Sequence, residues 1–318
     1  MILDVRDLKV SFRTEQGMVR AIDGVSFGVN EGEVLGIAGE SGSGKTVTLL
    51  AVLGLITDPN AVIEGSIKYR GRELVGLPSK EMRKLRGREI AMIFQDPMTA
   101  LTPVYTIGWQ IAEQILTHQN VSKKQAWSRA IDLLAEVNIP KPEEAVHRYP
   151  HQLSGGMRQR AVIAMALTCN PALLVADEPT TALDVTVQAQ ILDLLRKLQK
   201  SHGSAIVFIT HDLGVMAELA DRIMVMYAGR IVERATRAQI FAEPRHPYTR
   251  ALLDSIPPLD GPRPHRLRTI QGAPPSLLNL PEGCAFGPRC ADRFAACDSK
   301  PNLVGGAHDT ACFLAADK

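Results

Sequence analysis

The sequence predicts an α/β fold of the phosphate-loop NTPase type, and three observations support that prediction. Residues 39–46, Gly-Glu-Ser-Gly-Ser-Gly-Lys-Thr, match the phosphate-binding pattern G-x-x-x-x-G-K-[S/T]. A strand-like run, 33–38, precedes the motif and a helical run begins at Val47, which is the context that the motif requires. Short apolar runs then alternate with amphipathic segments, as in a mainly parallel sheet with helices on both faces.

The expected chemistry of this loop is binding of a nucleoside triphosphate. Gly39, Gly42 and Gly44 allow a tight turn whose N–H groups point at phosphate oxygens. The following helix directs the positive end of its dipole to the same place. Lys45 is expected to contact the β and γ phosphates, and the Thr46 hydroxyl to bind Mg²⁺. The alternative, a Gly/Ser surface loop, is disfavoured by the flanking strand and helix.

An antiparallel β subdomain is predicted at the N-terminus. Residues 2–12 and 18–27 alternate apolar and polar side chains, with a turn-like stretch between them, and a further strand is expected over 63–70. Phe12 stands at the end of the first strand, where its ring is placed to stack on a nucleotide base. By pattern alone, a half-buried strand aromatic is the other interpretation.

A helical insert is predicted over about 97–156. Residues 107–118 and 124–137 show helical spacing of apolar residues. Ser154 is a candidate N-cap for a helix over 157–169. Gly155 and Gly156 expose N–H groups at the start of that helix, which predicts a second anion-binding helix N-terminus.

Polar residues follow three apolar strand-like runs at their carboxyl ends, where open α/β sheets bind ligands. These residues are Gln95 after 89–94, Asp177 and Glu178 after 172–176, and His211 after 205–210. Asp177 fits the acidic residue that helps to hold Mg²⁺, and Glu178 can orient or polarise the attacking water. The sequence also predicts an amphipathic helix over 185–202 and a hairpin of strands 222–227 and 230–233.

Composition excludes several classes of protein. The chain has 318 residues and a formal net charge of +2, which gives no reason to expect nucleic acid as a partner. No apolar run approaches eighteen residues and no signal peptide is recognisable, so we expect a soluble, intracellular chain that meets a membrane through a partner. Beyond about Glu243 the chain becomes rich in Pro and Arg, which predicts a linker into a small tail. The expected domains are therefore 1–242 and 243–318.

Four of the five cysteines lie in the tail, at positions 284, 290, 297 and 312. In a reducing compartment such a group more often binds metal than forms disulfides. The spacing lacks the C-x₂-C pairs of most structural zinc sites. Zinc, an iron–sulfur cluster and scattered cysteines therefore all stay open, with some metal site favoured.

Six motifs together resemble those of an ABC-type ATPase. They are the loop at 39–46, Gln95, Leu153–Met157, Asp177-Glu178, Ala182–Asp184 and His211, in the order of Walker A, Q-loop, signature, Walker B, D-loop and switch histidine. The resemblance implies an ABC-type nucleotide-binding domain with ATP and Mg²⁺ as ligands. In this family two such domains meet head to tail, with each ATP between one Walker A and the other signature helix.

The resemblance also implies roles for individual residues. Implied catalytic residues are Glu178, His211 and Gln95. Implied nucleotide-binding residues are Phe12, Gly39, Ser41, Gly42, Ser43, Gly44, Lys45, Thr46, Gln95, Asp177, Ser154, Gly155, Gly156 and Asp184, with Thr46, Gln95 and Asp177 at Mg²⁺.

A narrower resemblance is to the ATPases of dipeptide and oligopeptide importers. It rests on Phe94–Pro103, Tyr149–Arg160, His246–Leu253 and the cysteine tail. It implies a second homologous ATPase subunit, two membrane permease subunits, a substrate-binding protein, and a peripheral place on the cytoplasmic face of the inner membrane. It also favours a [4Fe–4S] cluster on Cys284, Cys290, Cys297 and Cys312, with zinc as the alternative.

The resemblance leaves the solute open, because ATPases of importers for nickel, glutathione or haem are closely similar to those for peptides. Two further hypotheses are a soluble ABC protein that acts on DNA or the ribosome, and a degenerate regulatory module. The regulatory module is disfavoured because Glu178 and His211 are both present.

Overall fold

The computed structural model describes residues 1–180, 183–255 and 270–315. The chain divides into two compact units, which we treat separately. The phosphate-loop unit comprises residues 3–28, 34–75 and 210–318. The helix-rich unit comprises residues 1–2, 29–33 and 76–209.

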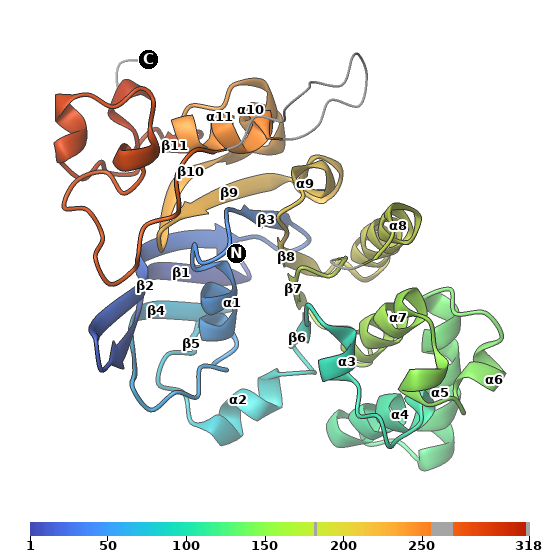
Figure 1. The fold of residues 1–318 in the computed structure, drawn as a ribbon. Coiled ribbons are helices and arrows are strands. Elements are labelled where there is room, and N and C mark those ends of the chain that lie inside the picture. The colour runs from blue at the N-terminus through green and yellow to red at the C-terminus, as the bar shows by residue number, and fades with distance from the viewer. Residues whose placement is uncertain (181–182, 256–269, 316–318) are drawn as a thin grey trace. The chain divides into compact units, whose positions relative to one another are not determined.

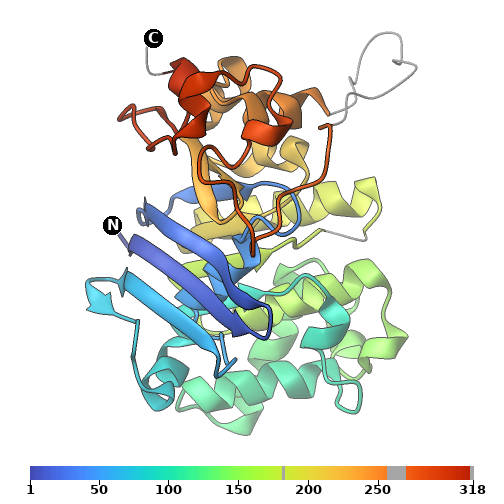
Figure 2. The ribbon, with the colours of Figure 1, turned by 60° about the vertical axis from the view of Figure 1, so that its left-hand side comes forward.

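An antiparallel sheet forms the first part of the phosphate-loop unit (Figure 2). Its strands, in spatial order, are β2 (Gly17–Val29), β1 (Leu3–Thr14), β4 (Ala61–Tyr69) and β5 (Arg72–Glu73). β1 and β4 run antiparallel, with Val5 opposite Ile67 and Phe12 opposite Ala61. The alternation of apolar and polar residues buries one face, so the predicted antiparallel subdomain is confirmed.

A second set of strands in this unit carries the phosphate loop (Figure 1). β3 (Val34–Ala38) pairs in parallel with β9 (Arg222–Tyr227), and β9 pairs antiparallel with β10 (Arg230–Thr236). Ala228 and Gly229 have φ angles of 47° and 78°, the left-handed values of a two-residue hairpin turn, which confirms the predicted hairpin. β11 (Asp309–Thr310) adds to the outer edge of β10.

One helix of the phosphate-loop unit lies where the sequence suggested a linker. The helices of this unit are α1 (Lys45–Val52), α9 (Leu213–Leu219), α10 (Arg237–Ala242) and α11 (Pro247–Asp254). The prediction of a linker from Glu243 is wrong for α11. Pro247 starts this helix at little cost, because its missing N–H belongs to the first turn, and the His246 side chain caps the helix by accepting from the Tyr248 N–H. The Pro-rich stretch 256–264 lies outside the described residues.

The helix-rich unit contains a parallel set of strands and most of the longer helices. β6 (Ile90–Ile93) pairs with β7 (Leu173–Asp177), and β7 pairs with β8 (Ala205–Ile209). The helices are α2 (Ser79–Leu85), α3 (Pro97–Ala100), α4 (Ile107–His118), α5 (Lys123–Glu136), α6 (Pro142–Ala145), α7 (Gly155–Ala166) and α8 (Val185–His202).

The predicted helical insert corresponds to a cluster in which α4 packs on α5, and both contact α7 (Figure 1). α7 begins at Gly155, two residues before the predicted start at Met157. Within the described ranges, no helix has both the length and the apolarity needed to cross a bilayer.

Candidate functional site

The phosphate loop needs glycine at two positions for reasons of space as well as conformation. A Cβ on Gly39 would lie 2.3 Å from the Met226 carbonyl oxygen, and one on Gly44 would lie 2.7 Å from the Ala21 carbonyl oxygen. Both glycines also have positive φ, at 147° and 100°. The loop therefore lies against β9 and β2 as close as a backbone can.

Lys45 is buried, and its ammonium is held over the loop. Its Nζ donates to the carbonyl oxygens of Gly39, at 2.8 Å, and Glu40, at 2.9 Å. Both acceptors are uncharged, so these two bonds fix the position of the ammonium without cancelling its charge. A positive charge placed this way suits a phosphate oxygen.

Ser43 supplies an independent indication that the loop is built for a ligand. Ser43 is only 4% exposed, yet its hydroxyl has no hydrogen-bond partner within the described part of the chain. A buried hydroxyl left without a partner is costly, and a phosphate oxygen would satisfy it. Immediately after it, Gly44 caps α1 with no side-chain bond to the first turn, and Thr46 is exposed there. The donors present fit a bound triphosphate.

In the helix-rich unit, Gln95 and Glu178 come together. The Gln95 Nε2 donates to the Glu178 Oε2 at 3.0 Å. Gln95 follows β6 and Glu178 follows β7, and because these strands pair in parallel their carboxyl ends lie side by side. Asp177, the last residue of β7, is buried. The parallel pairing of β6 and β7 thus brings together two residues that the sequence placed at strand ends.

Glu178 has an unusual backbone. Its φ is +47°, in the left-handed region that a non-glycine residue seldom adopts, and its N–H donates to the Ile209 carbonyl of β8 at 3.0 Å. The hydrogen bond to β8 holds this strained conformation. Strain of this kind is concentrated at functional sites, where it fixes the direction of a side chain.

The signature segment opens α7 as predicted. Ser154 caps the helix, its hydroxyl accepting from the Met157 N–H, and Gly155 is exposed at the first turn. A Cβ on Gly156 would lie 2.7 Å from Val187 on α8, so this glycine permits close packing of the two helix starts. Asp184 caps α8 by accepting from the Val187 N–H at 3.0 Å. Ala182 of the same motif lies outside the described residues.

The remaining predicted residues lie in the phosphate-loop unit. His211 is exposed and directly precedes the residue that caps α9. Phe12 is half-buried in β1, near the end of the strand.

The tail cysteines lie near one another, but the structure does not show the four-cysteine metal site expected for them. Burial raises the pKa of Cys284, Cys290 and Cys312, and neighbouring thiols of the group raise these values further. Backbone N–H groups act against these effects, for example those of Phe286 and Gly287 on Cys284. Across the described ranges, however, no three or more metal-ligating side chains are placed to hold one ion. The expected metal site, whether the iron–sulfur cluster or the zinc alternative, is therefore not shown by the described residues.

The structure also shows a group of residues that the sequence reasoning missed. Arg289, one residue before Cys290, forms an ion pair with Glu40, the second residue of the phosphate loop. Tyr248 of α11 also contacts Glu40. No sequence signal pointed to them, because the loop pattern leaves position 40 unspecified.

Comparison with known proteins decides the family. The model of the ABC transporter family matches residues 22–181, and the model of the oligopeptide/dipeptide transporter C-terminal region matches residues 232–297. The chain belongs to the ABC transporter family. This ABC transporter chain is 50% identical to the oligopeptide transport ATP-binding protein OppD of Haemophilus influenzae, over 100% of the chain and 98% of that protein. It is 51% identical to the dipeptide transport ATP-binding protein DppD of Bacillus subtilis, over 98% of the chain and 94% of that protein.

Solved ABC structures have the same fold. The dimeric ABC transporter cassette MJ0796 is similar with a TM-score of 0.67 at 28% identity, over 74% of this ABC transporter chain and 98% of that one. The cbiO1 protein of Clostridium perfringens is similar with a TM-score of 0.64 at 26% identity, over 76% and 91% of the two chains. The predicted ABC-type nucleotide-binding fold is thereby confirmed.

Proposed function

We propose that this chain is the ATP-hydrolysing subunit that powers import of dipeptides and short oligopeptides through an ABC permease. The observation that carries the proposal is the presence, in one chain, of a loop built for phosphate and a C-terminal region of the oligopeptide/dipeptide transporter type. Relatives named as oligopeptide and dipeptide transport ATP-binding proteins align over nearly the whole length. The division into an ATPase domain, 1–242, and an extension, 243–318, remains our prediction.

The proposed roles follow from the resemblance of the motifs to those of ABC-type ATPases. Lys45 and the N–H groups of the loop bind the β and γ phosphates, and Phe12 stacks on the base. Thr46, Gln95 and Asp177 hold Mg²⁺. Glu178 polarises the attacking water, and its direction is set by Gln95 and by the strained backbone. His211 assists at the γ phosphate.

A second ATPase subunit completes each nucleotide site in this proposal. Ser154, Gly155 and Gly156 at the start of α7, with Asp184, contact the nucleotide held by the partner subunit. The comparison structure of MJ0796 with ADP and phosphate is a dimer, which supports the proposal. Two membrane permease subunits and a substrate-binding protein make up the importer. The chain then lies peripherally on the cytoplasmic face of the inner membrane.

A groove on the helix-rich unit is the proposed docking site for a short cytoplasmic helix of the permease. The groove has a volume of about 440 Å³ and is lined by Trp109, Ala112, Glu113, Leu116, Thr117, Lys123 and Trp127. Trp109 is 44% exposed and stacks on Tyr105, with the ring centroids 3.9 Å apart. Val104 and Met98, which lie between Gln95 and Trp109 in the sequence, are also exposed large apolar side chains. An amphipathic helix matches such an apolar groove.

Trp109→Glu should separate ATP binding from permease coupling. We expect the variant to bind ATP as the wild type does, and to lose most co-purification with the permease and most peptide uptake in vesicles. A buried charge in place of an aromatic anchor costs roughly 2 kcal/mol or more of binding free energy. Met18→Glu, an equally exposed apolar position in the phosphate-loop unit, is the control. Undiminished uptake by the Trp109 variant would contradict the docking site.

We further propose that the four tail thiols bind a [4Fe–4S] cluster rather than a single ion. The support is chemical: all four cysteines are free of disulfides, and four thiolates are the usual ligand set of such a cluster. When bound, the cluster would order the tail.

Anaerobic purification should therefore give a brown protein with about four irons per chain. Cys297→Ser is expected to lose the colour and most of the iron, whereas Cys169→Ser, at the cysteine outside the tail, should keep both. The measurements are iron content and the visible absorption spectrum. A colourless protein with one zinc per chain, or with four reactive thiols and no metal, would contradict the cluster.

A further inference from the structure

We propose that Arg289, in the C-terminal segment, is a positioning residue of the phosphate loop. Through Glu40 it fixes the second residue of the loop and neutralises a carboxylate beside the triphosphate site. This inference rests on the proposed binding of ATP by residues 39–46. All of the groups involved belong to the phosphate-loop unit.

The contact between Arg289 and Glu40 is a two-point ion pair. Arg289 Nη1 donates to Glu40 Oε2 at 2.5 Å, and Arg289 Nη2 donates to Glu40 Oε1 at 2.9 Å. The Arg289 side chain is only 4% exposed, and that of Glu40 is 25% exposed. The planar guanidinium matches a carboxylate at two points, which fixes orientation as well as charge.

The guanidinium is itself held from other sides. Its Nε donates to the Gln271 carbonyl at 2.9 Å, and Nη1 also donates to the Tyr227 hydroxyl at 3.3 Å. Its central carbon lies 5.9 Å from the ring centroid of Tyr227 and 6.0 Å from that of Phe286. Hydrogen bonding to Glu40 is the largest effect on the pKa of Arg289, which is raised, so the side chain stays charged.

Glu40 is restrained through its backbone as well. Its N–H donates to the Tyr248 hydroxyl at 2.7 Å, so this donor is used within the protein. Its carbonyl oxygen accepts from Lys45 Nζ at 2.9 Å and from the Ser43 N–H at 3.2 Å. The same residue therefore links the side chain of Arg289 to the ammonium that we assign to the phosphates.

The charge of Glu40 explains why an arginine is needed. A carboxylate in a loop that binds a polyanion would repel the phosphates if it were free, and burial would strengthen that repulsion. Pairing with Arg289 neutralises the charge of Glu40 and points its carboxylate toward the C-terminal segment. We infer that the arginine removes a penalty on nucleotide binding rather than contacting the nucleotide.

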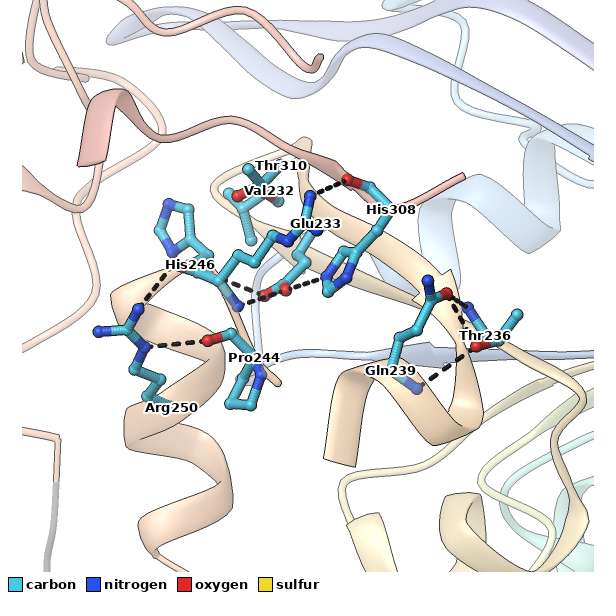
Figure 3. A network of polar contacts seen from close by, with 10 residues as sticks. Val232, Glu233, Thr236, Gln239, Pro244, His246, Arg250, His308 and Thr310 are labelled. Carbon is cyan, nitrogen blue, oxygen red and sulfur yellow. Dashed lines mark hydrogen bonds and ion pairs between the residues drawn. The ribbon is translucent and has the colours of Figure 1, made fainter. Parts of the chain in front are cut away.

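The part of the tail that follows Arg289 is anchored on β10, where Figure 3 shows His308 beside Glu233. On β10, the buried carboxylate of Glu233 accepts from His308 Nε2 at 2.7 Å, from the Arg245 N–H at 2.7 Å and from the His246 N–H at 3.0 Å. Arg234, also on β10, pairs with Asp309. These bonds fix the tail near His308 and Asp309 without involving the loop.

Local turns then set the position of Arg289 in the tail. The Gly287 N–H donates to the Cys284 carbonyl, and the Arg289 N–H donates to the Phe286 carbonyl, both at 2.9 Å. Arg289 thus ends a short 3-10 helix, 287–289, one residue before Cys290. The turn between two of the tail cysteines holds the arginine that orders the phosphate loop.

The test is the affinity for ATP with Mg²⁺, measured by calorimetry on the purified full-length chain. Arg289→Met is expected to weaken binding about 10-fold, because it leaves the Glu40 carboxylate unpaired. Adding Glu40→Gln to that variant is expected to restore the affinity to within about 3-fold of wild type, because the repelling charge is then gone. The deficit of Arg289→Met should also shrink as salt is raised from about 0.05 to 0.5 M.

The matched control is Arg234→Met, which removes another arginine–carboxylate pair of the tail away from the loop. It is expected to lower thermal stability as Arg289→Met does, but to leave ATP affinity unchanged. If Arg289→Met unfolds, Arg289→Lys keeps the charge, loses the two-point contact and should show a smaller deficit.

Wild-type affinity in Arg289→Met would overturn the inference. A loss of ATP affinity that Glu40→Gln does not reverse would also overturn it, because the role of the arginine would then be structural only. Lys45→Ala separates this failure from failure of the proposed function. If the wild type binds ATP and Lys45→Ala does not, the loop is the nucleotide site whatever Arg289 does.

Discussion

Glu178→Gln is expected to abolish steady ATP hydrolysis while leaving ATP binding intact. The carboxylate accepts from Gln95 Nε2 at 3.0 Å, and the amide oxygen of glutamine can accept the same bond, so the geometry should survive. An amide cannot polarise water as a carboxylate does, and loss of such a group lowers turnover by roughly 10²-fold or more. ATP should then accumulate in a closed dimer, visible as an ATP-dependent shift in size-exclusion chromatography.

The control for this variant is Glu143→Gln, an exposed carboxylate on α6 of the same unit, which should hydrolyse ATP at the wild-type rate. Hydrolysis should be measured on the assembled complex, because the proposed site needs a second subunit. Normal turnover by assembled Glu178→Gln would remove Glu178 from the mechanism. If the variant loses both ATP binding and turnover, the substitution disturbs the fold at the end of the strand.

Lys45→Ala should affect the earlier step, the binding of the nucleotide. The Lys45 ammonium is buried and lies on the Gly39 and Glu40 carbonyls, so its loss removes the positive charge of the loop and leaves both carbonyls with one donor fewer. Removal of a buried, hydrogen-bonded charge from a binding site costs roughly 2–5 kcal/mol, and we expect affinity to fall by about 30-fold or more.

Binding should be measured by calorimetry with ATP and Mg²⁺, together with the melting temperature of each protein. Lys68→Ala, at an exposed lysine on β4 of the same unit, is the matched control and should bind as the wild type does. Equal affinity in Lys45→Ala and wild type would show that residues 39–46 do not bind the triphosphate.

Elements that obey local rules could be predicted from the amino-acid sequence. The phosphate loop can be predicted because its glycines, lysine and threonine stand at fixed spacing between a strand and a helix. The Ala228-Gly229 hairpin can be predicted because its turn needs residues with a left-handed backbone conformation. Even the meeting of Gln95 and Glu178 was predictable, since neighbouring parallel strands present their carboxyl ends together.

Tertiary structure alone decided the features that depend on packing between distant segments. Arg289 and Glu40 are 249 residues apart, and nothing local distinguishes either from an exposed charge. Their pairing follows from the way α11, β9 and the tail pack their aromatic side chains, with the rings of Tyr227, Tyr248 and Phe286 within 5.3 Å of one another. Pairs of this kind carry no spacing rule, because the chain between the partners can take many paths. The helix α11 was missed for a related reason: its prolines resembled a linker, and burial of Tyr248 made it a helix.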